Sequence, residues 1–192
     1  MTRSLARTVS ILGHPLLMLP LALLLPAVAG GLPGTGGVAI AFALAAALVM
    51  GWSWRRVRQG RWAHVDASAG DERRALHRFL LPVLVASTLL AAWAPADVAP
   101  YLGLSALIVA VAMLLARWCT LSLHAAFAVF AALMLLRWTW WAGAATLVFA
   151  ALVVWSRLAL ARHRPRDLGA GIATGTGAAL LSWPLAPQWP SP

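Results

Sequence analysis

The sequence has little charge, and very little of that charge is negative. Only 10% of its 192 residues are Asp, Glu, Lys or Arg, whereas soluble domains contain roughly 25%. Mean hydropathy is +0.83, and 62% of the residues are hydrophobic. This composition excludes an ordinary soluble domain. It predicts one integral membrane domain covering residues 1–192.

Cysteine and acidic residues are also scarce. The single cysteine, Cys119, excludes an intrachain disulfide framework and a cysteine-based zinc site. Five acidic residues, dispersed along the chain, are too few for a two-metal carboxylate site, so we expect neither a metal nor another cofactor. Every one of the 15 basic residues is arginine. Because these arginines lie in short segments between apolar runs, membrane topology explains them better than nucleic-acid binding.

Long apolar runs dominate the rest of the chain. A helix that crosses a bilayer needs about 20 predominantly apolar residues. Seven runs approach that length: 11–31, 38–54, 79–94, 101–116, 121–136, 138–155 and 168–185. They predict an all-α polytopic bundle of six to seven transmembrane helices. The lower number applies if the first run, which ends near a sequence resembling a signal-peptidase site, is removed, although we expect it to stay as an anchor.

Details of these runs predict how the helices pair. The fifth and sixth runs are separated only by Arg137, which predicts a tight helical hairpin. Three prolines should kink the first run, which we expect to start near His14-Pro15. Gly171, Gly175 and Gly177 in the last run favour close helix packing.

The arginines also predict orientation. With seven spans, fourteen of them fall on the side of the amino terminus and only Arg137 on the other. This imbalance predicts a multi-pass protein of the cytoplasmic (inner) membrane with a cytoplasmic N-terminus. Four of the five histidines lie at or near the same side: His64, His77, His124 and His163.

The segment between Ser156 and Asp167 is the most informative. Pro165 suits the first turn of a helix, so we expect the last span to begin there, with Asp167 in its first turn. His163 would lie just before the helix, within reach of the Asp167 carboxylate. A carboxylate that holds one ring nitrogen leaves the other nitrogen basic. The alternative is a basic turn that only fixes topology or touches anionic lipid.

This segment resembles a known pattern. Ser156-Arg157, five residues, His163, three residues and Asp167 is similar to the third signature of the type 2 phosphatidic acid phosphatase (PAP2) superfamily, S-R-x5-H-x3-D. Ser122 and His124 resemble the Ser and His of the second signature, P-S-G-H.

The first signature, K-x6-R-P, is matched more loosely. In the loop at residues 55–78, the stretch from Asp66 to Arg74 keeps an arginine but lacks the lysine and the proline. The three stretches follow the family's order along the chain, and the predicted topology brings all three to one membrane face.

The resemblance implies a catalytic mechanism without metal. His163 would attack phosphorus and form a phosphohistidine, Asp167 would orient its ring, and His124 would protonate the leaving oxygen. The phosphate oxygens would be held by Arg157, Ser122, and one of Arg73 and Arg74.

This mechanism would make the protein a membrane phosphatase that hydrolyses a phosphomonoester or diphosphate of a lipid. The alternative is a degraded PAP2-like protein that binds anionic lipid without turnover. The expected partners are a lipid phosphate and the bilayer, with no nucleic acid. The residues alone favour non-catalytic roles for the three other histidines: His14 as a helix cap, and His64 and His77 as solvated side chains.

Overall fold

A computed structural model describes residues 2–65, 67, 69–93 and 98–185, and every regular element in this part of the chain is helical. The fold is therefore all-α, as predicted. The elements are α1 (Thr2–Leu12), α2 (Pro15–Ala29), α3 (Thr35–Arg58), α4 (Gly70–Ala91), α5 (Ala99–Leu114), η1 (Leu115–Arg117), α6 (Leu123–Trp138), α7 (Trp140–Ala159), α8 (Pro165–Ser182) and η2 (Trp183–Leu185).

Several of these helices are suited to a membrane. Within the described residues, α3, α4, α5 extended to Arg117, and α7 are long and apolar enough to cross a bilayer. The bent pair α1 and α2 makes a fifth candidate if it counts as one span. Helix α6 is apolar but has only 16 residues. The chain thus has the character of a membrane protein, while six to seven spans stay a prediction.

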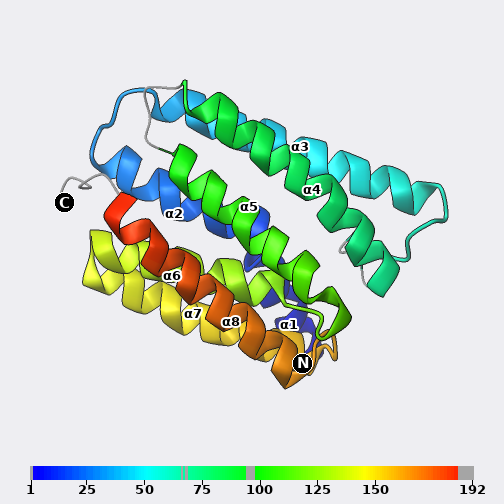
Figure 1. The fold of residues 1–192 in the computed structure, drawn as a ribbon. Helices are drawn as coiled ribbons and strands as arrows, with labels where there is room; N and C mark the ends of the chain where they lie inside the picture. Colours follow the sequence, from blue (N-terminus) through cyan, green and yellow to red (C-terminus); the bar gives the residue numbers. More distant parts are fainter. Residues whose placement is uncertain (1, 66, 68, 94–97, 186–192) are drawn as a thin grey trace.

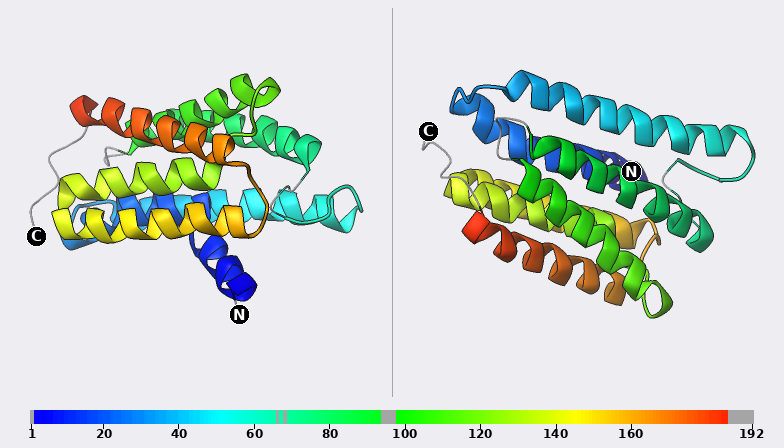
Figure 2. Two further views of the ribbon diagram at one scale, coloured as in Figure 1. Left: turned by 90° about the horizontal axis from the view of Figure 1, so that it is seen from below. Right: turned by 45° about the horizontal axis from the view of Figure 1, so that its top comes forward.

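The first apolar run differs most from expectation. Its helix α2 begins at Pro15, as expected, but residues 11 and 12 belong to a separate helix, α1, and the two helices are bent by 53°. His14 has an extended backbone, φ −65° and ψ 137°, because a residue that precedes proline is disfavoured in the helical region. Gly13 lies at the bend, and a Cβ there would collide with Val153 of α7. In Figure 2, α1 projects from the rest of the bundle.

The predicted hairpin between α6 and α7 is confirmed. Thr139 is the only residue between the two helices, and its Oγ1 accepts a hydrogen bond from the Ala142 amide at 3.3 Å. A Cβ on Gly143 would collide with the backbone of Leu136. Small residues therefore let the two helices approach closely at the turn.

Two of the three glycines of α8 pack as predicted. A Cβ on Gly171 would meet the carbonyl of Ser122, and a Cβ on Gly175 would meet the backbone of Ala126. Gly177 has nothing within 4 Å of such a Cβ, so it does not mark a close contact. The first two glycines seat α8 against α6.

The helices form a packed part, in which many residues are buried, and a loose part, α3 and α4, in which few residues are buried. The buried core includes residues of α2, α5, α6, α7 and α8, among them Met18, Ile108, Phe130, Val153 and Ala179. In Figure 1, α3 and α4 lie along one flank of this core. Of the 24 residues of α3, only Val49 and Ser53 are buried.

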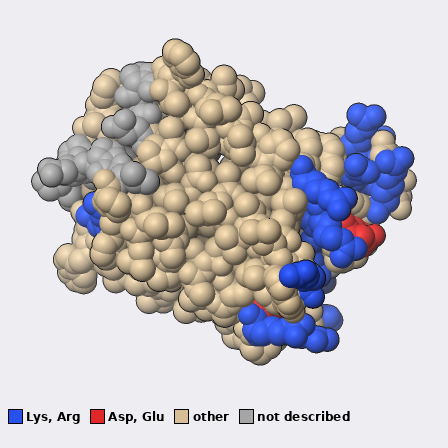
Figure 3. Space-filling view, viewed as in Figure 1, with Lys and Arg blue, Asp and Glu red and all other residues tan. Residues whose placement is uncertain are grey.

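Positive charge gathers at one end of the bundle, as the arginine pattern predicted (Figure 3). Three arginines occupy the last turn of α3, and Arg157 occupies the last turn of α7. Arg137 ends α6, at the opposite end from Arg157, because α6 and α7 form a hairpin. We call the end of the bundle that carries Arg157 and the last turn of α3 the arginine end.

Candidate functional site

A cavity of about 80 Å³ lies at the arginine end. At 10–15 Å³ for one water, this is room for roughly six molecules, enough for a tetrahedral oxyanion. Four of the predicted site residues line it: Arg73, His124, Arg157 and His163. They come from α4, α6, α7 and the loop between α7 and α8. The structure thus gathers residues from all three stretches singled out in the sequence.

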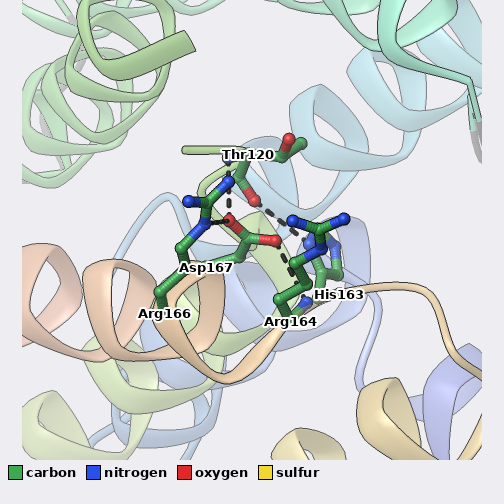
Figure 4. A network of polar contacts seen from close by, with 5 residues as sticks. All are labelled: Thr120, His163, Arg164, Arg166 and Asp167. Carbon is green, nitrogen blue, oxygen red and sulfur yellow. Dashed lines mark hydrogen bonds and ion pairs between the residues drawn. The ribbon is translucent and has the colours of Figure 1, made fainter. Parts of the chain in front are cut away.

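His163 is held by a backbone carbonyl. Its Nδ1 lies 3.1 Å from the oxygen of Thr120 (Figure 4). With the proton on Nδ1 donated to this carbonyl, the neutral ring keeps a lone pair on Nε2. The pKa of His163 is lowered from 6.5 to about 4, mainly by burial and then by Arg157 and Arg73; Asp167 and the Thr120 carbonyl oppose the shift. The ring is therefore neutral at pH 7, as a nucleophile requires.

Asp167 lies where it was expected but makes different contacts. It is in the first turn of α8, which begins at Pro165 as predicted. Its Oδ1 accepts from the Thr120 amide at 2.9 Å, and its Oδ2 accepts from the Arg164 amide at 3.0 Å (Figure 4).

The direct contact with His163 that the sequence suggested is therefore replaced by an indirect one. The amide of Arg164, at the start of α8, binds one oxygen of Asp167 as in a capping box, and the amide of Thr120, in the loop before α6, binds the other. Asp167 fixes Thr120, and the carbonyl of Thr120 holds the ring of His163. Asp167 therefore positions the loop segment that holds the His163 ring.

Arg157 is anchored by a residue that the sequence analysis missed. Only 5% exposed, it donates from Nη1 to the Ser10 Oγ at 2.6 Å. Ser10 lies on α1, on the buried face that also contains Ala6 and Val9. The spacing of these residues at i, i+3 and i+4 was the available signal for a packed amphipathic helix.

His124 stands in the first turn of α6 beside another histidine. Its ring meets that of His14 edge to face, with centroids 5.1 Å apart. Among the described residues, the buried Nε2 of His124 has no hydrogen-bond partner, a state that costs about 1–3 kcal/mol. A phosphate oxygen in the cavity would satisfy it.

His14 is the helix cap that the sequence predicted, because its Nδ1 accepts from the Leu16 amide at 3.2 Å. It also lines the cavity. With Nδ1 occupied as an acceptor, the proton of the neutral ring is on Nε2. The proline after His14 signalled the cap but gave no sign of the second role.

Two predicted phosphate ligands do not line this cavity. Ser122 is fully buried, and its Oγ accepts from the Ala125 amide at 3.4 Å as the cap of α6. Its short side chain is committed to starting the helix that presents His124. Arg74 is exposed, whereas Arg73, one residue earlier, lines the cavity with its Nε buried. The rotation of α4 about its axis thus determines which of the two arginines lines the cavity.

The remaining residues of the loop at 55–78 have mixed outcomes. His64 is exposed, as expected, but His77 is buried and lines the cavity, so the prediction of a solvated side chain was wrong. Glu72 accepts from the amides of Ala63 and Ala69 at 2.9 and 3.0 Å, which fastens the loop to the start of α4. Asp66, the first residue of the loosely matched stretch, lies outside the described residues.

The described residues contain no group of three or more His, Cys, Asp or Glu side chains placed to hold a metal ion. The cavity is lined by four imidazoles, those of His14, His77, His124 and His163, and by the guanidinium groups of Arg73, Arg157 and Arg162, around a space of oxyanion size. No known protein family, curated protein or solved structure matches the chain.

Proposed function

We propose that the protein is a membrane phosphatase that hydrolyses a phosphomonoester or diphosphate of a lipid through a phosphohistidine at His163. The observation that carries this proposal is that His163, His124 and two arginines line one cavity at the arginine end. The PAP2-like spacing of Ser156, Arg157, His163 and Asp167 supports the same reading.

The proposed reaction has two displacement steps. First, Nε2 of His163 attacks phosphorus, and the P–N bond forms as the bond to the leaving oxygen breaks. His124 gives that oxygen a proton. A water molecule then attacks phosphorus, His124 accepts its proton, and the P–N bond breaks to free phosphate and His163.

The arginines supply electrostatic stabilisation. Arg157 and Arg73 carry fixed positive charge beside the cavity, where it can balance the charge on the equatorial phosphate oxygens. The hydrogen bond between Arg157 and Ser10 limits the movement of this guanidinium group. A preorganised cation of this kind needs little reorganisation during the reaction.

The proposal includes a membrane arrangement. We take α1 with α2 as one broken span and add α6 and α8 to the four helices that are long enough alone. This gives seven spans of the cytoplasmic membrane, with the arginine end in the cytoplasm. The substrate would then be a lipid of the inner leaflet.

The test is phosphate release from a lipid phosphate in detergent. His163→Ala should lower the turnover rate by at least about 10³-fold, because it removes the nucleophile. His64→Ala is the matched control, since His64 is the exposed histidine of the loop before α4, and it should keep wild-type turnover. Equal turnover by wild type and His163→Ala would refute the mechanism.

One observation favours the alternative of a lipid-binding protein without turnover. The Asp167 carboxylate is occupied by backbone amides and does not contact the His163 ring, so the carboxylate–imidazole pair that activates a nucleophile is lacking. This alternative predicts that wild type binds the lipid phosphate in the same detergent and releases no phosphate.

A further inference from the structure

A second, larger cavity lies between α3 and the helices α2, α4 and α5. Its volume is about 460 Å³. Its lining is almost wholly apolar and includes Leu19, Phe42, Ala45 and Leu84, with Ser87 as the one side chain that carries a polar atom. We call this cavity the apolar groove.

The apolar groove lies directly beside the cavity that holds the histidines. Pro15, Leu16, Val49 and Leu80 line both spaces. From these shared residues, one direction leads to Arg73, Arg157 and His163, and the other leads along α3 away from the arginine end. The combined space has a cationic head and an apolar arm, which is complementary in charge and polarity to an amphiphile with an anionic head.

The groove also opens to the outside of the bundle. Its lining includes Leu44 of α3 and Leu90 of α4, which are 66% and 74% exposed. Both belong to helices that are long and apolar enough to cross a membrane, so in a bilayer this opening faces lipid chains. Because α3 buries so few residues, it leaves the groove accessible from the hydrocarbon.

The size of the groove fits one long hydrocarbon chain. Along α3 its lining runs from Gly37 to Val49, which at 1.5 Å for each residue is about 18 Å. Half of a hydrocarbon core of 30 Å is about 15 Å, so the groove is as deep as one leaflet. An apolar cavity of 150 Å³ binds one benzene, and by that ratio the groove holds about 18 carbons.

We propose that the apolar groove holds a single hydrocarbon chain of the lipid whose phosphate lies beside His163. This inference rests on the proposed function and narrows its substrate class. The preferred substrates are lipid phosphates that can place one chain of up to about 18 carbons in the groove, and a second chain, where there is one, stays in the bilayer.

The test narrows the groove with a tryptophan. Ala45→Trp fills it, whereas Ala47→Trp places the same side chain on the same helix at an exposed position outside the groove. Turnover of hexadecyl phosphate and of butyl phosphate is measured for both variants in lipid nanodiscs. We expect Ala45→Trp to lower kcat/KM for hexadecyl phosphate at least tenfold relative to Ala47→Trp and to leave butyl phosphate unchanged. Equal kcat/KM values for hexadecyl phosphate would overturn the inference and leave the proposed function standing.

Two further measurements keep the inference testable. If Ala45→Trp does not fold, Ala41→Trp, one turn away in the same groove, takes its place. If wild type releases no phosphate from either compound, the proposed function fails, and binding of hexadecyl phosphate then decides. Binding at least tenfold weaker for Ala45→Trp than for Ala47→Trp supports a chain in the groove, and equal binding overturns it.

Discussion

Helices α6 and α3 are both strongly apolar, yet the structure uses them in opposite ways. Eleven of the 16 residues of α6 are buried, against two of the 24 residues of α3. In a membrane, apolar character does not by itself drive helices together, because lipid tails are as apolar as leucine. Close packing needs backbones that approach, and α6 has this through Gly143, Gly171 and Gly175 of its neighbours.

The difference separates two tasks. The packed part of the bundle, α6 to α8, carries His124, Arg157 and His163, and the proposed mechanism requires these side chains to have a fixed geometry. The loose part, α3 and α4, supplies Arg73 and His77 to the cavity and one wall of the apolar groove. Under the proposed function, a substrate from the bilayer would reach the apolar groove past α3, which buries few of its residues.

The largest expected effect is on kcat/KM, and it tests whether the loose part contributes to the proposed reaction. Arg73→Gln should lower kcat/KM for a lipid phosphate by about 100-fold, the range seen when one transition-state donor is removed. Arg74→Gln, next to it but exposed, should stay within about twofold. If kcat/KM of Arg73→Gln also stays within about twofold of wild type, the site belongs to the packed part alone.

A smaller effect should reveal the packing contrast itself. Gly175→Ala should lower the free energy of unfolding in detergent by about 1–3 kcal/mol, because its Cβ meets the backbone of Ala126. Gly177→Ala on α8 and Gly51→Ala on α3 should cause no loss, since nothing lies within 4 Å of either Cβ. A loss of similar size at Gly51 would mean that α3 is packed as tightly as α8.

The smallest effect concerns the charge that the loose part places beside His163. The pKa of His163 is about 4, so its NMR titration, identified by the signal missing from His163→Ala, should have its midpoint near pH 4. Arg73→Gln should raise this midpoint, because Arg73 is one of the two cations that lower it. Arg74→Gln should leave it in place, and an equal rise in both variants would contradict the assignment of Arg73.

The same shift sets a stability window. Because the folded pKa of His163 lies below the ordinary value of 6.5, its contribution to stability is fully present above pH 6.5. It is lost as the pH falls from 6.5 towards 4, since the unfolded chain binds the proton first.

Local chemistry allowed part of this structure to be predicted. The start of α8 at Pro165 and the cap at His14 follow from how proline acts at helix ends. The hairpin was predicted at Arg137, and the structure places its turn two residues later, at Thr139, whose short polar side chain caps α7. The gathering of arginines at one end follows from the alternation of spans.

The features that were missed depend on tertiary contacts. Ser10 reaches Arg157 only because α1 packs on α7, and no local pattern specifies that partner. The choice between Arg73 and Arg74 depends on how α4 is rotated about its axis. The use of the Asp167 carboxylate by the Thr120 amide depends on a loop that is 47 residues away in the chain. Each of these features depends on segments that are distant in the chain, and neither segment's sequence identifies the other as its partner.

The contact between Ser10 and Arg157 has a consequence for biosynthesis. The two residues are separated by 147 positions, so Ser10 leaves the ribosome long before its partner is made. His163 and Asp167 follow later still. A chain that is still being translated can therefore insert its first helices before Arg157 and His163, which complete the lining of the cavity, have been made.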